Sequence, residues 1–247
     1  MRNFKYDISP KLKKFKPITP SLRHKVAVDK SFLSKVFREK CLSINSKNHA
    51  GRNYTGRITC RHKGGRVKRS LRFIDLNYTN CYSKVNHSLS YEYDPNRSAF
   101  IVRTFNNTFK PFYVLSNDSN GTDREIQRLK DIIPGTNVYN INGFCRSAGT
   151  FATVVNHQDN KTRLRLPSRK VISVSNIDTF ASIGKNSNQL HKLTKLGKAG
   201  ANRWRGIRPT TRGCAQNPHD HPNGGKTRGG ISRTKWGKIA KWIKTGS

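Results

Sequence analysis

Residues 197–230 read GKAGANRWRGIRPTTRGCAQNPHDHPNGGKTRGG, and the rest of the chain is interpreted around them. The stretch is rich in glycine and arginine, carries one acid, Asp220, and shows neither helical nor strand periodicity. Such a segment buries too little apolar area to offset the entropy lost on ordering. Its glycines permit close approach by another molecule, and its arginines carry planar, permanently charged groups that suit phosphate. The stretch therefore predicts an RNA-binding extension, with a disordered basic tail as the alternative.

The composition of the whole chain points to the same kind of partner. The 247 residues include 49 Lys and Arg against 13 Asp and Glu, which gives a formal net charge of +36. A compact fold with this much positive charge repels itself unless a polyanion compensates it. Only 33% of the residues are hydrophobic, which is enough for one or two small cores. No apolar run is as long as a membrane span, so we expect none.

The titratable residues show no pattern typical of an enzyme or a metal protein. The five cysteines are scattered without a C-x-x-C pair, which indicates a reducing compartment and no zinc finger. His219 and His221 lie near Cys214, but three ligands do not complete a tetrahedral zinc site. The chain contains no recognisable catalytic triad or phosphate-binding glycine motif. We predict no metal, no cofactor and no enzymatic activity, and a metal-dependent RNA enzyme centred on the two histidines is the least favoured alternative.

The middle of the chain predicts two units of short β-strands separated by turn residues. In the first unit the expected strands are 66–76, 99–105 and 111–115. In the second they are 137–142, 151–157, 162–166 and 170–174, with turns at 158–161 and 167–169. Thr162, Leu164 and Leu166 alternate with Arg163 and Arg165, which is typical of a half-buried strand with a basic outer face. This pattern alone leaves sandwich and barrel open.

Two helical segments are also expected. Residues 31–40 predict a short helix with Phe32, Leu33 and Val36 on one side, and residues 189–196 predict a helical turn.

Several runs resemble, in order, the signatures of the universal large-subunit ribosomal protein family called L-two (L2). They are GRNYTGRITCRHKGG at 51–65, EYDPNRSA at 92–99, RSAGT at 146–150, and GKAGANRWRGIRPTTRG with NPHDHPNGG at 197–213 and 217–225. KFKPITPSLRH at 14–24 resembles the family's N-terminal arm; a cleavable targeting peptide is the competing interpretation, although no Arg-rich amphipathic helix supports it. The resemblance implies a mainly β protein in which an OB-fold barrel is followed by a Src-homology-3-like barrel, with long basic irregular N- and C-terminal extensions.

Four domains follow from the resemblance and the changes in composition. They are a basic N-terminal arm at 1–48, an OB-type RNA-binding barrel at 49–120, a Src-homology-3-like barrel at 121–192, and a Gly/Arg-rich rRNA-binding extension at 193–247.

The resemblance also implies a function and partners. A member of this family is a structural constituent of the large ribosomal subunit that binds large-subunit rRNA near the peptidyl-transferase centre and supports assembly and subunit association. Its partners are then that rRNA, other ribosomal proteins, and the small subunit across the subunit interface. A non-ribosomal RNA-binding protein or RNA chaperone is the alternative. The Asn-rich, Ala-poor composition favours a mitochondrial ribosome, with the bacterial cytoplasm or a plastid as alternatives.

The predicted RNA contacts are cations, histidines and polar or aromatic side chains in the glycine-rich runs, where the backbone can approach a sugar–phosphate chain. They are Arg52, Arg57, Arg61, His62, Lys63, Arg66, Lys68, Arg69, Arg146, Lys198, Arg203, Trp204, Arg205, Arg208, Arg212, Asn217, His219, His221, Lys226 and Arg228. The chain departs from the family at Asn223, where a second histidine is typical, and at 226–228, where Lys-Thr-Arg replaces an acidic part.

Overall fold

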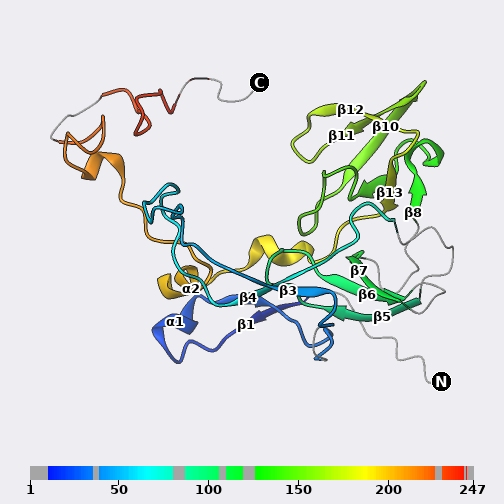
Figure 1. Ribbon diagram of the computed structural model, residues 1–247, viewed down its shortest axis with the longest axis horizontal. Helices are drawn as coiled ribbons and strands as arrows, with labels where there is room; N and C mark the ends of the chain where they lie inside the picture. Colours follow the sequence, from blue (N-terminus) through cyan, green and yellow to red (C-terminus); the bar gives the residue numbers. More distant parts are fainter. Residues whose placement is uncertain are drawn as a thin grey trace. The chain divides into compact units, whose positions relative to one another are not determined.

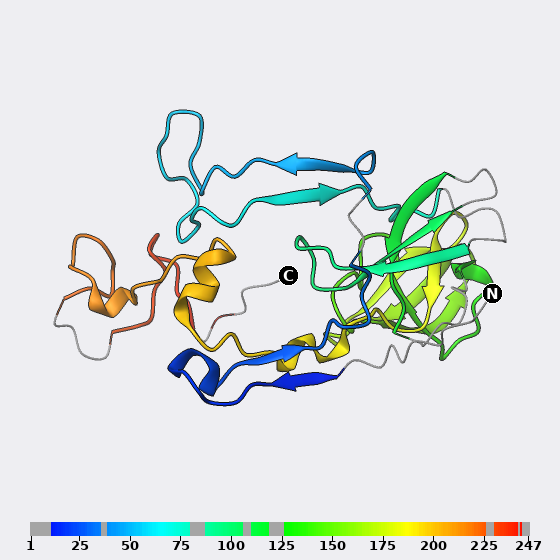
Figure 2. The same ribbon diagram turned by 90° about the horizontal axis from the view of Figure 1, so that it is seen from below.

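The computed structural model describes residues 11–35, 39–79, 87–105, 110–118, 126–225, 230–241 and 243 (Figure 1 and, turned by 90°, Figure 2). These belong to two compact units. Unit 1 comprises residues 1–47 and 67–201, and unit 2 comprises residues 48–66 and 202–247. Every pair of named strands is antiparallel, and the protein is mainly β, as the sequence predicts. Within the described ranges, no helix has the length and apolarity needed to cross a membrane.

Five of the named strands form the OB-type part of unit 1. A meander joins β5 (His87–Glu92), β6 (Ile101–Phe105) and β7 (Pro111–Leu115), and a ribbon joins β3 (Ser43–Ser46) to β4 (Arg69–Arg72). A parallel bridge from Ile74 to Tyr113 places the chain after β4 beside β7. An OB-fold barrel has five strands, so this number agrees with the prediction. The predictions at 99–105 and 111–115 are confirmed, whereas regular strand covers only the middle of 66–76.

Three short elements precede these strands. β1 (Leu12–Lys14) pairs with β2 (Val26–Val28), and the single turn α1 (Pro20–Arg23) connects them. The helix expected at 31–40 is wrong for the residues described there: the chain forms a turn, and 36–38, including Val36, lie outside the described residues. The apolar pattern reflects burial instead, because Leu33 is buried and the Phe32 ring packs edge-on against Phe100 with centroids 5.5 Å apart.

The second half of unit 1 is one six-stranded sheet in the order β12-β11-β10-β9-β13-β8. Its strands are β8 (Ile126–Arg128), β9 (Asn137–Tyr139), β10 (Ala152–Gln158), β11 (Lys161–Arg165), β12 (Val171–Ser175) and β13 (Phe180–Ile183). β11 buries Thr162 and Leu164 and exposes Arg163 and Arg165, which confirms the predicted alternation. β9 ends earlier than predicted because Asn140 and Asn142 adopt positive φ angles of 52° and 40°, which an extended strand does not allow.

The core of this sheet is aliphatic and includes Leu129 from the 3-10 turn η1 (Leu129–Asp131). Leu129, Ile141, Ala152 and Leu164 are fully buried in one cluster. The predicted hairpin turns at 158–161 and 167–169 are confirmed, the first with Gln158 paired to Lys161 across two turn residues.

Buried polar side chains join the two halves of unit 1. The Ser187 hydroxyl accepts a hydrogen bond from Phe100 N at 3.0 Å, and Asn188 Nδ2 donates to Ser98 O at 2.6 Å. The Tyr78 hydroxyl lies 2.7 Å from that of Ser182. After this junction the 3-10 turn η2 (Gln189–Leu193) confirms the helical turn predicted at 189–196.

Helix α2 (Ala199–Trp204) corrects the expectation that residues 197–230 lack helical structure. Its end is marked by Gly206, which has a φ of +88° and donates its N–H to Arg203 O, the left-handed ending that glycine favours. The helix has only six residues, which are too few to show a helical hydrophobic periodicity in the sequence. After it, the described part of unit 2 contains only the 3-10 turn η3 (Gly213–Ala215) and isolated bridges.

Candidate nucleic-acid interface

Residues 48–66 form a compact turn-rich loop, here called the basic loop, which contains no acid. The two ends of the loop approach each other at Gly51, where only glycine fits. Gly51 has a φ of +76°, and a Cβ placed on it would lie 2.3 Å from Cys60 O. The carbonyl of Gly51 accepts hydrogen bonds from the backbone N–H groups of Thr59 and Cys60 at 2.9 and 3.0 Å. Across the loop, Arg52 and Ile58 form an antiparallel bridge.

The tip of the basic loop is organised by one side chain. Asn53 Oδ1 accepts hydrogen bonds from Thr55 N at 3.1 Å, from Thr55 Oγ1 at 2.7 Å and from Arg57 N at 3.0 Å. Gly56 then closes a turn with a φ of +77° and donates its N–H to Asn53 O. The tip is therefore held by its own polar groups rather than by a core.

The segment after α2 lies directly beside the basic loop, although more than a hundred residues separate them in sequence. Gly64 N donates to Gly206 O at 2.8 Å, and Arg208 N donates to His62 O at 2.9 Å. A Cβ on Gly206 would lie 3.1 Å from Arg66 Cβ and 3.3 Å from Gly64 O, so glycine permits this close approach. The structure thus brings together two of the basic runs that the sequence singles out.

His62 has a structural part in this contact. Its ring Nδ1 lies 3.1 Å from Pro209 O, and because a carbonyl only accepts, Nδ1 carries the proton and donates. His62 and Arg66 are partly buried. The predicted contacts of unit 2 with exposed side chains are Arg52, Arg57, Arg61, Lys63, Arg203, Trp204, Arg205, Arg208, Arg212, Asn217 and His219.

The run 213–225 folds into a second small loop, here called the tip loop. The His221 ring packs over Gly213, where a Cβ would lie 2.3 Å from ring carbon Cε1. His221 Nδ1 accepts a hydrogen bond from Asn223 N at 3.0 Å, so in the neutral ring Nε2 carries the proton and is the nitrogen that can donate. No three of the described His, Cys, Asp and Glu residues, including His219, His221 and Cys214, are grouped to hold a metal ion.

Asn223, which stands where the resemblance leads us to expect histidine, ties the tip loop to the chain that follows. Its Nδ2 donates to Ile231 O at 3.0 Å, and its Oδ1 accepts from Arg233 N at 2.8 Å. Lys226 and Arg228, both predicted contacts, lie outside the described residues.

The remaining predicted contacts, Lys68, Arg69, Arg146 and Lys198, belong to unit 1. Arg69 is partly used for folding, because its guanidinium donates to Pro95 O at 3.0 Å. Arg146 Nε donates to Asn140 Oδ1 at 2.9 Å, and burial lowers the pKa of its guanidinium. The twenty predicted residues therefore divide between unit 1, unit 2 and the residues outside the described ranges, and their roles in RNA binding stay predictions.

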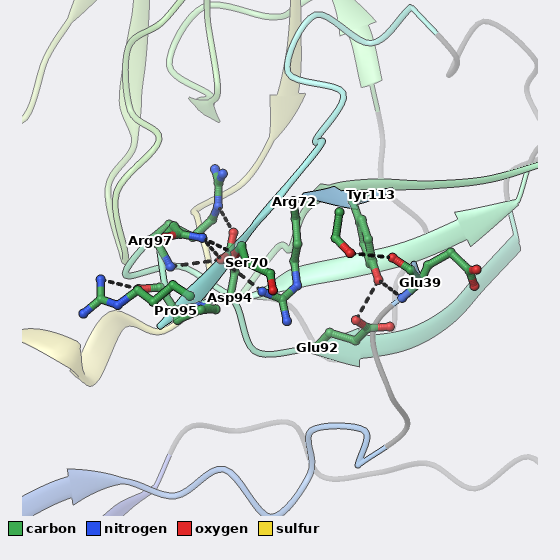
Figure 3. Close-up of polar contacts among 11 residues, drawn as sticks. Glu39, Ser70, Arg72, Glu92, Asp94, Pro95, Arg97 and Tyr113 are labelled. Atoms are coloured by element: carbon green, nitrogen blue, oxygen red, sulfur yellow. Dashed lines mark hydrogen bonds and ion pairs between the residues drawn. The ribbon is translucent and has the colours of Figure 1, made fainter. Parts of the chain in front are cut away.

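The run EYDPNRSA forms a buried polar cluster that the sequence did not predict (Figure 3). Asp94 is fully buried and accepts from Arg97 Nε at 2.7 Å and from an Arg72 guanidinium nitrogen at 3.4 Å. Nearby, the Tyr113 hydroxyl donates to Glu92 Oε2 at 2.9 Å and accepts from a backbone N–H, an arrangement in which burial and then the Glu92 hydrogen bond raise the pKa of Tyr113. These contacts join β4 and β7 to β5 and to the turn that follows it, so the charges of this run serve the fold of unit 1.

A strongly basic, acid-poor chain that folds into two β-barrels and carries basic, turn-rich loops defines a class of protein suited to binding polyanions. Comparison with known families specifies the class. Residues 39–123 match the model "Ribosomal Proteins L2, RNA binding N-terminal domain", and residues 124–242 match "Ribosomal Proteins L2, C-terminal domain". The chain belongs to the ribosomal protein L2 family, and its fold is an OB-type barrel followed by a Src-homology-3-like barrel.

Two curated relatives agree with this assignment. Both are named large ribosomal subunit protein uL2, one from Wolbachia sp. subsp. Drosophila simulans (strain wRi) and one from Wolbachia pipientis wMel. Each is 39% identical over 259 aligned positions, which cover 95% of this chain and 93% of the relative.

Proposed function

We propose that this protein is a structural constituent of the large ribosomal subunit and binds large-subunit rRNA through the basic loop and the segment after α2. The observation that supports this most directly is their pairing by backbone hydrogen bonds, Gly64 to Gly206 and Arg208 to His62. Unit 2 contains sixteen Lys and Arg and one acid, Asp220. Pairing two such segments concentrates positive charge, and rRNA supplies the matching negative charge.

The binding mechanism combines charge neutralisation with close backbone approach. Exposed arginines on both segments present planar groups that can donate two hydrogen bonds to one phosphate. The glycines of the basic loop leave room beside the backbone, because a Cβ on Gly56 or Gly65 would meet nothing within 4 Å. This role requires no covalent chemistry, metal or cofactor from the chain.

The tip loop has the finer role in this proposal. Asn217–Gly225 lies near the peptidyl-transferase centre, and His221 offers its Nε2 proton to rRNA while Nδ1 is held by Asn223 N. Other ribosomal proteins and the small subunit are the further partners, through assembly and subunit association. We place the protein in a mitochondrial ribosome, with the bacterial cytoplasm or a plastid as the alternatives; the two Wolbachia relatives are bacterial and do not decide between them.

The test is incorporation into large subunits followed by a high-salt sucrose gradient. We expect the wild-type chain to co-migrate with the subunit, whereas an RNA chaperone would dissociate. Replacing Arg203, Arg205, Arg208 and Arg212 by Gln removes charge-assisted bonds of roughly 1.5–3 kcal/mol gross each, so incorporation should fall. His221→Ala should incorporate and lower peptide-bond formation or subunit joining. The reverse pattern would contradict the proposed division of roles.

A further inference from the structure

Tyr54 stands at the tip of the basic loop and is 99% exposed, more than any other large hydrophobic side chain described in the structure. It is the second residue of the turn that Gly56 N closes onto Asn53 O at 3.1 Å. A tyrosine in this position leaves a large apolar ring in water. Single exposed aromatic residues are common in proteins, so exposure alone does not assign a function.

The backbone under Tyr54 is fixed. The three hydrogen bonds accepted by Asn53 Oδ1 come from the two residues on the far side of Tyr54, Thr55 and Arg57. The bridge between Arg52 and Ile58 closes the loop behind them. Because tyrosine has only two side-chain torsions, a ring presented from a fixed turn loses little entropy when a ligand covers it.

The chemistry around the ring restricts its ligand. The side chains of Arg52 and Arg57 flank Tyr54 in sequence and are both exposed, and the loop has no acid. A ligand that contacts both the arginines and the Tyr54 ring must carry a negative charge, and close to that charge it must present an exposed, flat, apolar face of its own. An unpaired nucleotide combines a phosphate with such a face, whereas a paired base hides its faces inside the duplex.

We propose that Tyr54 is a stacking residue that binds an unpaired base of the RNA held by the basic loop, with Arg52 and Arg57 on the adjoining phosphates. The proposal rests on the proposed RNA-binding function, and it adds to that function a residue and a ligand class. It also means that the loop distinguishes single-stranded RNA from a regular helix.

The experiment uses the full-length chain and four fluorescent probes. They are a large-subunit rRNA transcript, an adenine oligonucleotide of about 12 nucleotides, an abasic oligomer with the same phosphates, and polyglutamate. We compare the wild type with Tyr54→Ala, Tyr54→Phe and, as an exposed apolar control outside the basic loop, Ile18→Ala, a residue that is 80% exposed.

We expect Tyr54→Ala to weaken binding of the adenine oligonucleotide about 5- to 150-fold, the range for one stacked base. Tyr54→Phe and Ile18→Ala should stay within about twofold of the wild type, since the first keeps the ring and the second leaves the basic loop unchanged. The abasic oligomer should bind all four proteins alike, because its phosphates need only the arginines.

Several outcomes would overturn the inference while leaving the proposed function in place. One is wild-type affinity of Tyr54→Ala for both the transcript and the adenine oligonucleotide. Another is an equal loss on the abasic oligomer, which would mean that Tyr54 supports the loop rather than stacking. Tighter, Tyr54-dependent binding of polyglutamate would indicate an acidic protein partner instead. If the wild type binds no transcript, the proposed function itself fails.

Discussion

Three glycines of the basic loop allow a graded test of whether RNA binding needs the loop in its observed conformation. Gly51 combines a φ of +76° with a Cβ position 2.3 Å from Cys60 O. Gly56 has a φ of +77° but nothing within 4 Å, and Gly65 has neither a positive φ nor a close neighbour. Alanine therefore adds backbone strain and a steric clash at position 51, backbone strain alone at position 56, and neither at position 65.

The expected costs follow from these surroundings. A left-handed alanine costs about 1–2 kcal/mol, so Gly56→Ala should weaken RNA binding about 5- to 30-fold if the loop relaxes in the free protein and is restored on RNA. Gly51→Ala must also displace the chain at Cys60 and weaken the two hydrogen bonds to Gly51 O, which adds about 1–3 kcal/mol. Gly65→Ala should stay within about twofold.

The assay is titration of the full-length chain with a large-subunit rRNA transcript, accompanied by hydrogen exchange of the amides of residues 48–66. If a strained loop keeps its conformation in the free protein, the cost appears as faster exchange rather than lost affinity. Equal affinities and equal exchange for Gly51→Ala, Gly56→Ala and Gly65→Ala would refute the reasoning, because the loop geometry would then have no energetic consequence.

Three further predictions concern charge, a thiol and the tip loop. If roughly eight phosphates are neutralised, log K for rRNA should fall with log[salt] with a slope of about −7, and a slope typical of one or two contacts would mean that most of the charge is solvated. Burial raises the pKa of Cys145 to about 11, so at pH 8 only about 0.1% of it is thiolate; iodoacetamide should spare it in the native protein and modify it in denaturant, and rapid native labelling would contradict this. Asn223→Ala should speed hydrogen exchange of the Arg233 backbone amide, whereas Asn223→Asp, which keeps the acceptor oxygen, should keep that amide protected. Equal exchange in both variants would mean that the hydrogen bond from Arg233 N to the residue 223 side chain does not stabilise the tip loop.

Local patterns in the sequence predicted most of the strands, whereas the barrels followed from the family resemblance. Alternation in β11 identified its buried and exposed residues, because a half-buried strand imposes a period of two on its own sequence. The predicted strand 137–142 is longer than the observed one because Asn140 adopts a left-handed backbone conformation. The side-chain amide of Asn140 then donates to Leu76 O and accepts from Arg146 Nε. Asparagine between apolar residues was the available signal for that early end.

The candidate site was predicted only in part, because its geometry depends on contacts distant in sequence. Nothing local to Gly64 indicates that it pairs with Gly206, although the two glycine-rich runs were each identified. Tyr54 was overlooked because its importance comes from exposure on a fixed turn, and Asn53 was the signal, since Asn-x-x-Gly favours such turns. The ion pair between Asp94 and Arg72 inside unit 1 likewise joins residues distant in sequence, and no local pattern indicates it.

Unit 2 requires an explanation different from that of unit 1, because no described hydrophobic residue within it is buried. Its segments are joined by backbone hydrogen bonds, each worth about 0.5–1.5 kcal/mol net, while the charges on the two segments repel each other. An anion that binds both segments adds stability in proportion to RT ln(1 + [L]/Kd), and it removes the repulsion as it binds. The contact between the basic loop and the segment after α2 should therefore be the part of the protein most strongly coupled to RNA. A variant that weakens this contact should therefore lower the affinity for RNA, and bound RNA should in turn stabilise the contact.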